Sequence, residues 1–180
     1  MLLTMNRQEA RYATVGTPQK FWQTWRDEDD TDEVIAPVAN RPMTNAEKAA
    51  VFSGDFAGAR SYFEAMVSEG DRAVTAQDRT IYALCRPERL LDLVRRFTVF
   101  EGGMRKIARH QQFFGIRTAV ERVKQLDLEG VRKGGVIWHT QGSGKSLTMV
   151  MLGRALALDR DIPNPRIIIV TDRDDLDKQI

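Results

Sequence analysis

The sequence predicts an α/β fold toward its carboxyl-terminal end, preceded by a mostly helical segment. Val136–Trp138 and Ile167–Val170 are short apolar runs, which are typical of buried strands. Lys145–Leu158, between them, is apolar on almost every side, as expected of a helix packed on a sheet. Strand, loop, helix and strand within about 35 residues form a βαβ unit, and this unit implies a parallel sheet.

Composition limits the classes of protein to which the chain can belong. The chain has 180 residues, of which 42% are apolar and 29% charged, a profile typical of a globular protein. No apolar run approaches the ~20 residues that a membrane-spanning helix needs, so we expect no membrane contact. Cys85 is the single cysteine beside two histidines, which excludes an internal disulfide and a cysteine-rich metal site and indicates a reducing cytoplasm.

The chain divides into four predicted parts. Residues 1–26 carry weak signals of extended structure and end in an aromatic cluster. Residues 27–45 are acidic and then contain prolines, which is typical of a linker. Residues 46–130 show helical patterns and form a predicted connector, and residues 131–180 begin the α/β part.

Three helices are predicted in the connector. Thr44 or Asn45 could cap a helix that starts at Ala46. Pro87 suits the first position of a helix whose apolar face is broad, comprising Leu90, Leu91, Leu93, Val94 and Phe97. The longest helical pattern runs from Met104 to Leu126.

Charge is unevenly distributed although the net charge is only +2. Six of the seven residues from Asp27 to Glu33 are acidic, and this run is either a solvated loop or a docking segment for a partner. Between Arg86 and Lys124 there are ten Lys/Arg and four Asp/Glu, which fits either a nucleic-acid-binding face or a solvated helix face.

The stretch Gly142-Ser143-Gly144-Lys145-Ser146 carries the most specific chemical signal, because it lies where the first predicted strand turns into the helix. Backbone N–H groups of a glycine-rich loop can converge on a phosphate, and the positive end of the helix dipole points at the same place. Lys145 would stabilise the β- and γ-phosphates of ATP, and the Ser146 hydroxyl would hold Mg²⁺.

His139 departs from the usual phosphate-loop pattern, in which that position is the first glycine. The departure is tolerable because the tight turn and the close approach to phosphate fall at Gly142 and Gly144. The alternative interpretation is an ordinary glycine-serine turn that binds nothing.

Two further candidate sites are less specific. Gln111 lies on an apolar stripe between Ile107 and Phe114, and its amide could pair with an adenine edge or be satisfied by neighbouring backbone. Thr171, Asp172 and Arg173 follow the second predicted strand, at the sheet edge where ligands gather. Arg173 could contact a DNA phosphate or form a surface ion pair.

These motifs resemble a known family. The motor region of the type I restriction enzyme R subunit is similar to two stretches of this chain, GGVIWHTQGSGKSLTM and the later IIIVTDRDDLDKQI. In that family the residues His-Thr-Gln stand directly before the phosphate loop. RHQQFFGIRTAVERV resembles the glutamine-motif helix of that family, and residues 1–26 resemble the end of its nuclease domain. The resemblance is most specific from Gly134 onward.

The resemblance implies an incomplete P-loop (RecA-like) motor lobe within an ATP-dependent translocase and endonuclease. It implies ATP and Mg²⁺ as cofactors, and double-stranded DNA and the methylation and specificity subunits as partners. On this basis Gln111, Gly142, Ser143, Gly144, Lys145 and Ser146 bind the nucleotide, and Thr171 to Arg173 lie near the DNA.

No complete catalytic set is predicted in the chain. The carboxylate–lysine signature of the nuclease is not found and is expected before Met1, whereas the acidic Walker B pair and the arginine fingers are expected after Ile180. We therefore expect the isolated chain to be inactive. Two alternatives stay open: a piece of another superfamily two helicase or P-loop ATPase without a nuclease, and a non-catalytic truncated product.

Overall fold

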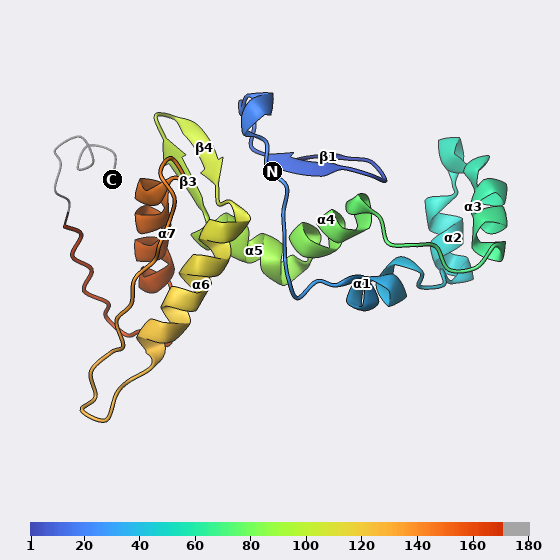
Figure 1. The fold of residues 1–180 in the computed structure, drawn as a ribbon. Coiled ribbons are helices and arrows are strands. Elements are labelled where there is room, and N and C mark those ends of the chain that lie inside the picture. Colours follow the sequence, from blue (N-terminus) through green and yellow to red (C-terminus); the bar gives the residue numbers. More distant parts are fainter. Residues whose placement is uncertain (171–180) are drawn as a thin grey trace.

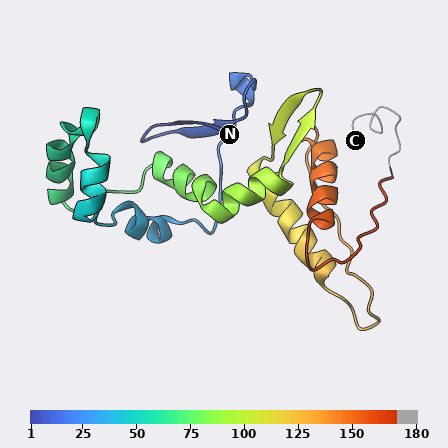
Figure 2. The same cartoon turned by 180° about the vertical axis from the view of Figure 1, so that it is seen from behind.

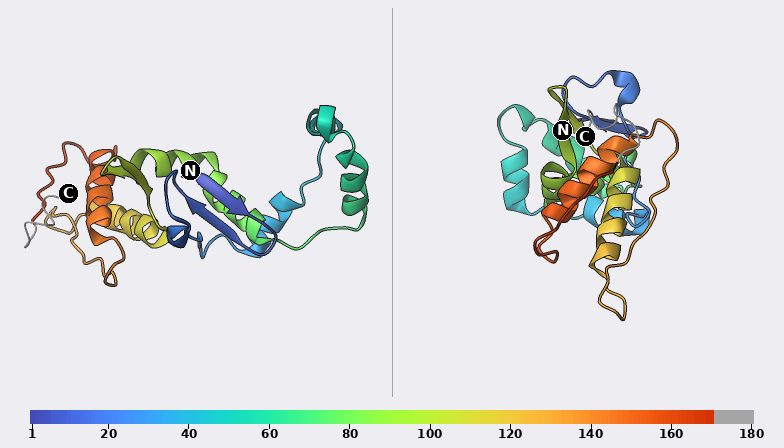
Figure 3. Two further views of the ribbon diagram at one scale, coloured as in Figure 1. Left: turned by 90° about the horizontal axis from the view of Figure 1, so that it is seen from above. Right: turned by 90° about the vertical axis from the view of Figure 1, so that its left-hand side faces the viewer.

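The computed structural model describes residues 1–170, and these form a mixed α/β structure that is elongated (Figure 1). The amino-terminal hairpin pairs β1 (Leu2–Met5) antiparallel with β2 (Ala10–Ala13), which confirms the extended structure predicted there. The pair α2 (Asn45–Val51) and α3 (Ala59–Ser68) lies at one end of the molecule, and α7 (Lys145–Ala157) lies toward the other (Figure 3).

Two predicted helix starts are confirmed. Thr44 caps α2, because its hydroxyl accepts from the Glu47 N–H while the Glu47 carboxylate accepts from the Thr44 N–H. Pro87 is the first residue of α5 (Pro87–Arg96), which follows α4 (Ala76–Cys85). The apolar face of α5 is narrower than predicted, because Leu93 is buried whereas Leu91 and Val94 are exposed.

The predicted linker, residues 27–45, is partly helical. It contains α1 (Asp32–Ala39), in which Ile35 is buried. Asp27 pairs with Arg89 at 2.9 Å, Asp30 with Arg86 at 2.9 Å and Asp32 with Arg79 at 2.6 Å. These acidic side chains therefore tie the linker to α4 and α5 instead of forming a freely solvated loop.

The helix predicted from Met104 begins later than expected. β3 (Thr98–Glu101) and β4 (Met104–Ile107) form an antiparallel hairpin, and α6 (His110–Lys124) follows it. Gly102 and Gly103 join the strands with φ of 55° and 77°, the left-handed geometry of a two-residue turn that glycine adopts readily. This hairpin takes the first residues of the predicted helix.

Neither predicted strand of the βαβ unit forms. Val136–Trp138 and Ile167–Val170 run beside α7 in extended form, and neither pairs with a strand anywhere in residues 1–170 (Figure 2). Both sheets in that part of the chain are two-stranded and antiparallel, so the structure does not show the predicted parallel sheet. The physical reason is that a strand needs neighbouring strands to bond its N–H and C=O groups, and these segments have none beside them.

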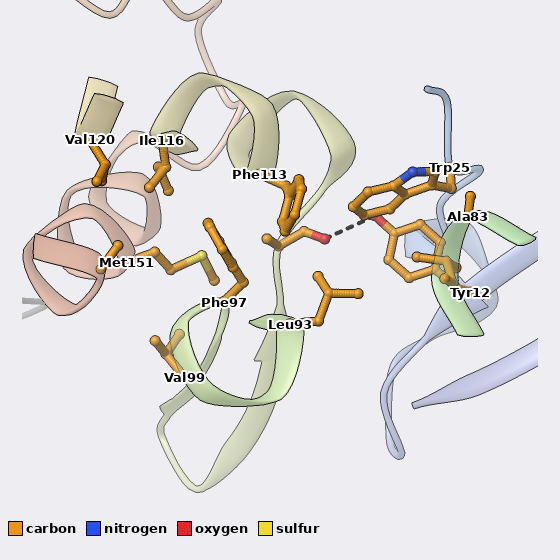
Figure 4. Packing of buried hydrophobic residues seen from close by; sticks show 13 residues of the cluster. Tyr12, Trp25, Ala83, Leu93, Phe97, Val99, Phe113, Ile116, Val120 and Met151 are labelled. Atoms are coloured by element: carbon orange, nitrogen blue, oxygen red, sulfur yellow. Dashed lines mark hydrogen bonds between the residues drawn. The ribbon is translucent and has the colours of Figure 1, made fainter. Parts of the chain in front are cut away.

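One hydrophobic core connects the two hairpins, through β2 and β3, with α4, α5, α6 and α7. Phe113 of α6 lies at its centre, with Phe97 and Met151 on one side and Tyr12 and Trp25 on the other (Figure 4). The Tyr12 hydroxyl donates a 2.9 Å hydrogen bond to the Ala108 carbonyl oxygen, the dashed line in that view. Burial raises the pKa of this hydroxyl well above its usual range, so Tyr12 stays a donor.

None of the helices described in residues 1–170 combines the length and the apolar character that a bilayer crossing requires.

Candidate nucleotide-binding site

The loop before α7 has the backbone geometry that a phosphate cradle requires. Gly142 and Gly144 have φ of 74° and 86°, in the left-handed region that favours glycine. His139 is not in that region, so the side chain at this position costs no strain. The structure thus confirms that the sharp turns fall at Gly142 and Gly144, as the sequence predicts.

The start of α7 is open. No side chain caps it, and the first hydrogen bond of the helix runs from the Thr148 N–H to the Gly144 carbonyl oxygen at 3.0 Å. Within residues 1–170, the backbone N–H groups of Gly144 to Leu147 donate to no other backbone group. By contrast, α2 and α4 satisfy their first turns through capping boxes. Unpaired donors and the helix dipole together favour an anion at this position.

Lys145 and Ser146 lie at this opening. Lys145 is exposed, and it forms no ion pair with any residue in the described part of the chain. Ser146 is half-buried in the first turn. An ammonium group with no internal partner is available to a phosphate, and a hydroxyl in the first turn is suited to Mg²⁺. The donor set therefore fits a magnesium-bound triphosphate.

Gln112, not Gln111, is the buried glutamine of α6. Gln112 is 3% exposed, whereas Gln111 is exposed, so the apolar stripe predicted through Gln111 is wrong. The Gln112 amide nitrogen donates to the Gly144 carbonyl oxygen at 3.0 Å and to the Thr148 hydroxyl at 3.1 Å. Its amide oxygen accepts from the Arg109 N–H at 2.9 Å. One side chain therefore fixes the phosphate loop to the start of α6.

The sequence contained a signal for this residue. Gln112, Ile116 and Val120 are spaced by four residues, and all three are buried on the face of α6 that meets α7. The close approach also explains Gly144, because a Cβ there would lie 3.0 Å from the Gln112 amide nitrogen.

Two depressions border the loop. One, of about 500 Å³, is lined mainly by polar residues and includes Gln111 together with His139 to Ser143. The other, of about 340 Å³, lies between the loop, β4 and the segment that follows β2. The structure therefore brings Gln111 next to the phosphate loop, while Thr171, Asp172 and Arg173 lie outside the described residues.

Half of the basic residues between Arg86 and Lys124 are neutralised by ion pairs in the part of the chain that the structure describes. Five of the ten basic residues in this stretch form ion pairs: Arg86, Arg89, Arg96, Lys106 and Lys124. The Glu121 carboxylate and, after it, the Asp159 carboxylate at 3.1 Å hold the pKa of the Lys124 ammonium above its usual value. The stretch is thus less suited to nucleic acid than its composition suggests.

Comparison with known proteins agrees with the motifs. Residues 111–180 match the family model described as SWI2/SNF2 ATPase. The type I restriction enzyme HindI endonuclease subunit of Haemophilus influenzae is 43% identical over 103 residues, which is 54% of this chain and 10% of that protein. No solved structure matches the chain significantly.

Two similar chains come from Methanocaldococcus jannaschii. The type I restriction enzyme endonuclease subunit named MjaIXP is 28% identical over 67% of this chain and 12% of its own length. The one named MjaVIIP is 31% identical over 55% of this chain and 10% of its own. The chain thus matches about a tenth of the length of these relatives, and by its matched residues it is related to the endonuclease subunits of type I restriction enzymes, as the motifs predict.

Proposed function

We propose that the chain is part of the ATP-dependent translocase and endonuclease subunit of a type I restriction-modification system. The observation that carries this proposal is the loop Gly142–Ser146. It has two left-handed glycines, N–H groups from Gly144 to Ser146 that donate to no backbone group in residues 1–170, and a lysine that forms no ion pair within those residues. The names of the relatives and the ATPase family match support the same function.

In this proposal the loop binds ATP with Mg²⁺. The N–H groups of Gly142 and of Gly144 to Ser146 would surround the phosphates. Lys145 would neutralise charge on the β- and γ-phosphates, and the Ser146 hydroxyl would be a magnesium ligand. A magnesium ion held by Ser146 would neutralise charge on the phosphates. Lys145 stabilises phosphate here without completing a catalytic set, since phosphoryl transfer also needs groups that hold the metal and orient the water.

The parallel sheet belongs to the same proposal. Val136, Trp138, Ile168 and Val170 are all more than four-fifths exposed, which is unusual for such apolar side chains. Both segments flank α7, and Ile167 lies against Gly153 of this helix. We propose that they become strands of a P-loop motor lobe when neighbouring strands are present.

The four-part division at residues 26, 45 and 130 fits this arrangement. Residues 1–26 would end a nuclease-like domain, 27–45 link it to the helical connector 46–130, and 131–180 begin the motor lobe. Double-stranded DNA and the methylation and specificity subunits are the proposed partners, with Thr171 to Arg173 near the DNA. Gln111, which the sequence predicts as the adenine reader, lies beside the loop, so a base on that side is one of two placements open to the nucleotide.

A second candidate is an ATPase motor without a nuclease. The SWI2/SNF2 match favours it, because that family model is described only as an ATPase. A nucleotide site would be common to both candidates. DNA cleavage by the full-length subunit with its partners separates them, since only the restriction subunit cuts.

Binding of Mg·ATP to the full chain, measured by isothermal titration calorimetry, tests the nucleotide site. Lys145→Ala removes the only side-chain charge in the loop, and we expect it to weaken binding at least tenfold, about 1.4 kcal/mol or more. Lys48→Ala, in α2 and far from the loop, is the matched control and should leave binding unchanged. Equal affinities for the wild-type chain and Lys145→Ala would refute the assignment.

A further inference from the structure

The second depression beside the phosphate loop has the character of a nucleoside pocket. It measures about 340 Å³, and one wall is formed by the segment Val15–Phe21 that follows the amino-terminal hairpin. Met104 of β4 and Leu147 of α7 contribute to the other walls, and Gly142 to Gly144 lie at its edge. It thus opens directly onto the loop that we propose binds the triphosphate.

Its lining suits a planar base better than the other depression does. Val15, Phe21 and Met104 are each at least half exposed, at 77%, 51% and 50%, and all three lie around this cavity. Apolar side chains left exposed beside a polar cradle mark a place where an apolar ligand surface is covered. Thr17 and Arg109 add polar groups to the same cavity. The depression with Gln111 also has an exposed aromatic side chain, Trp138, but Ile137 is the one other large apolar residue among the described residues that line it.

The wall from Val15 to Phe21 is held in position from both sides. The Thr14 hydroxyl donates to the Arg105 carbonyl oxygen at 2.6 Å, which fixes the segment to β4. The Trp22 indole N–H donates to the Thr17 carbonyl oxygen at 3.0 Å, and the Gln23 N–H donates to the Tyr12 carbonyl oxygen at 3.0 Å. Because these bonds fix the segment to β4 and to the amino-terminal hairpin, a base entering the cavity would meet a preformed wall.

We infer that the base and ribose of the bound nucleotide lie in this cavity, so that the amino-terminal segment Val15–Phe21 forms one wall of the ATP site. The inference rests on the proposed function, because the triphosphate must be held by Gly142–Ser146 for the nucleoside to reach the cavity. It assigns the base to the side of the loop away from Gln111.

This placement links the nucleotide to the amino-terminal hairpin. The Tyr12 hydroxyl of β2 donates a hydrogen bond to the carbonyl oxygen of Ala108, two residues before α6. The Gln112 amide of α6 donates one to the carbonyl oxygen of Gly144 in the loop. A nucleoside in the cavity would contact both the segment Val15–Phe21 and the loop, and so would connect the hairpin to the loop a second time. Binding of ATP and the position of the hairpin would then affect each other reciprocally.

Two probes separate this inference from the phosphate-loop assignment: Mg·ATP, and magnesium tripolyphosphate, which has no nucleoside. Phe21→Ala should weaken Mg·ATP roughly tenfold in calorimetry, the effect of losing one aromatic contact to a base, and should leave tripolyphosphate binding unchanged. Lys145→Ala should weaken both. Phe56→Ala, at an exposed phenylalanine outside both depressions, is the matched control.

Hydrogen exchange supplies a readout that needs no substitution. Mg·ATP should slow exchange of the amides from Val15 to Phe21, whereas tripolyphosphate should protect only the loop. Tripolyphosphate binding that depends on Lys145, together with an unaltered ATP affinity in Phe21→Ala and no protection of residues 15–21, would overturn this inference alone. A selective loss of ATP affinity in Gln111→Glu with Phe21→Ala unaffected would place the base in the other depression. Failure of both probes to bind would overturn the phosphate loop and this inference together.

Discussion

Replacing Gln112 by leucine should destabilise the protein far more than the same change at its neighbour Gln111. The Gln112 side chain makes three hydrogen bonds, to the Arg109 N–H, the Gly144 carbonyl oxygen and the Thr148 hydroxyl. A buried hydrogen bond contributes about 1 kcal/mol net, and leucine fills most of the volume, so we expect a loss of roughly 2–3 kcal/mol. For a chain of this size that corresponds to a fall in Tm of roughly 4–12 °C.

Thermal unfolding followed by circular dichroism, with urea titration as a second measurement, tests this difference. Gln111→Leu is the control, and because Gln111 is exposed its free energy of unfolding should change by about 0.5 kcal/mol or less. If the two variants melt at the same temperature, Gln112 does not hold the loop to α6 and the reasoning from its contacts is refuted.

Three further predictions concern other parts of the chain. Asp27→Ala should lower the free energy of unfolding in urea by about 3–5 kcal/mol, because it leaves Arg89 buried without its carboxylate. Glu64→Gln, which breaks an exposed ion pair, should lower it by about 0.5 kcal/mol or less. Similar losses in the two variants would contradict the buried pair. The hydrogen bond from the Arg72 guanidinium holds the folded-state pKa of Asp78 below its unfolded value. The stabilisation from this pair is therefore fully present above the unfolded pKa of Asp78 and is lost as pH falls through its folded-state pKa. Asp78→Asn should therefore lose less stability than the wild type between about pH 5 and 2 in acid titrations, and an identical acid profile would be inconsistent with this account. Ile168→Lys should reduce aggregation measured by light scattering without lowering Tm, because it places a charge on an exposed apolar segment. Unchanged scattering would show that chains do not aggregate through this segment.

The backbone geometry of the loop Gly142–Ser146 could be predicted from sequence because its information is local. Five consecutive residues specify the turn, the close approach and the charge, and the positive φ values of Gly142 and Gly144 follow from the glycines themselves. The helix starts at Thr44 and Pro87 are local signals of the same kind and are confirmed.

The sequence pattern predicts the wrong glutamine as the buried one because its helical phase is wrong. Including Met104 and Ile107 in the helix set the phase by residues that belong to β4, and this placed Gln111 on the apolar stripe. The two glycines at 102 and 103 were a recognisable hairpin signal. Starting the helix at His110 instead puts Gln112 on the buried face.

The strands and the acidic run depend on partners distant in sequence. An apolar run predicts that a segment is suited to a sheet, but the hydrogen bonds of a parallel strand come from other strands, and residues 1–170 supply none to Val136–Trp138. Asp27 and Asp30 find their arginines 62 and 56 residues away, a pairing that no local pattern encodes.

The central claim is that backbone amides at the start of α7 surround a triphosphate, and amide resonances of the ¹⁵N-labelled chain test it most directly. On addition of magnesium tripolyphosphate, the account predicts saturable shifts concentrated at Gly142 to Leu147, which Lys145→Ala abolishes. Shifts that spare these amides, or that persist at other basic positions in Lys145→Ala, would contradict it.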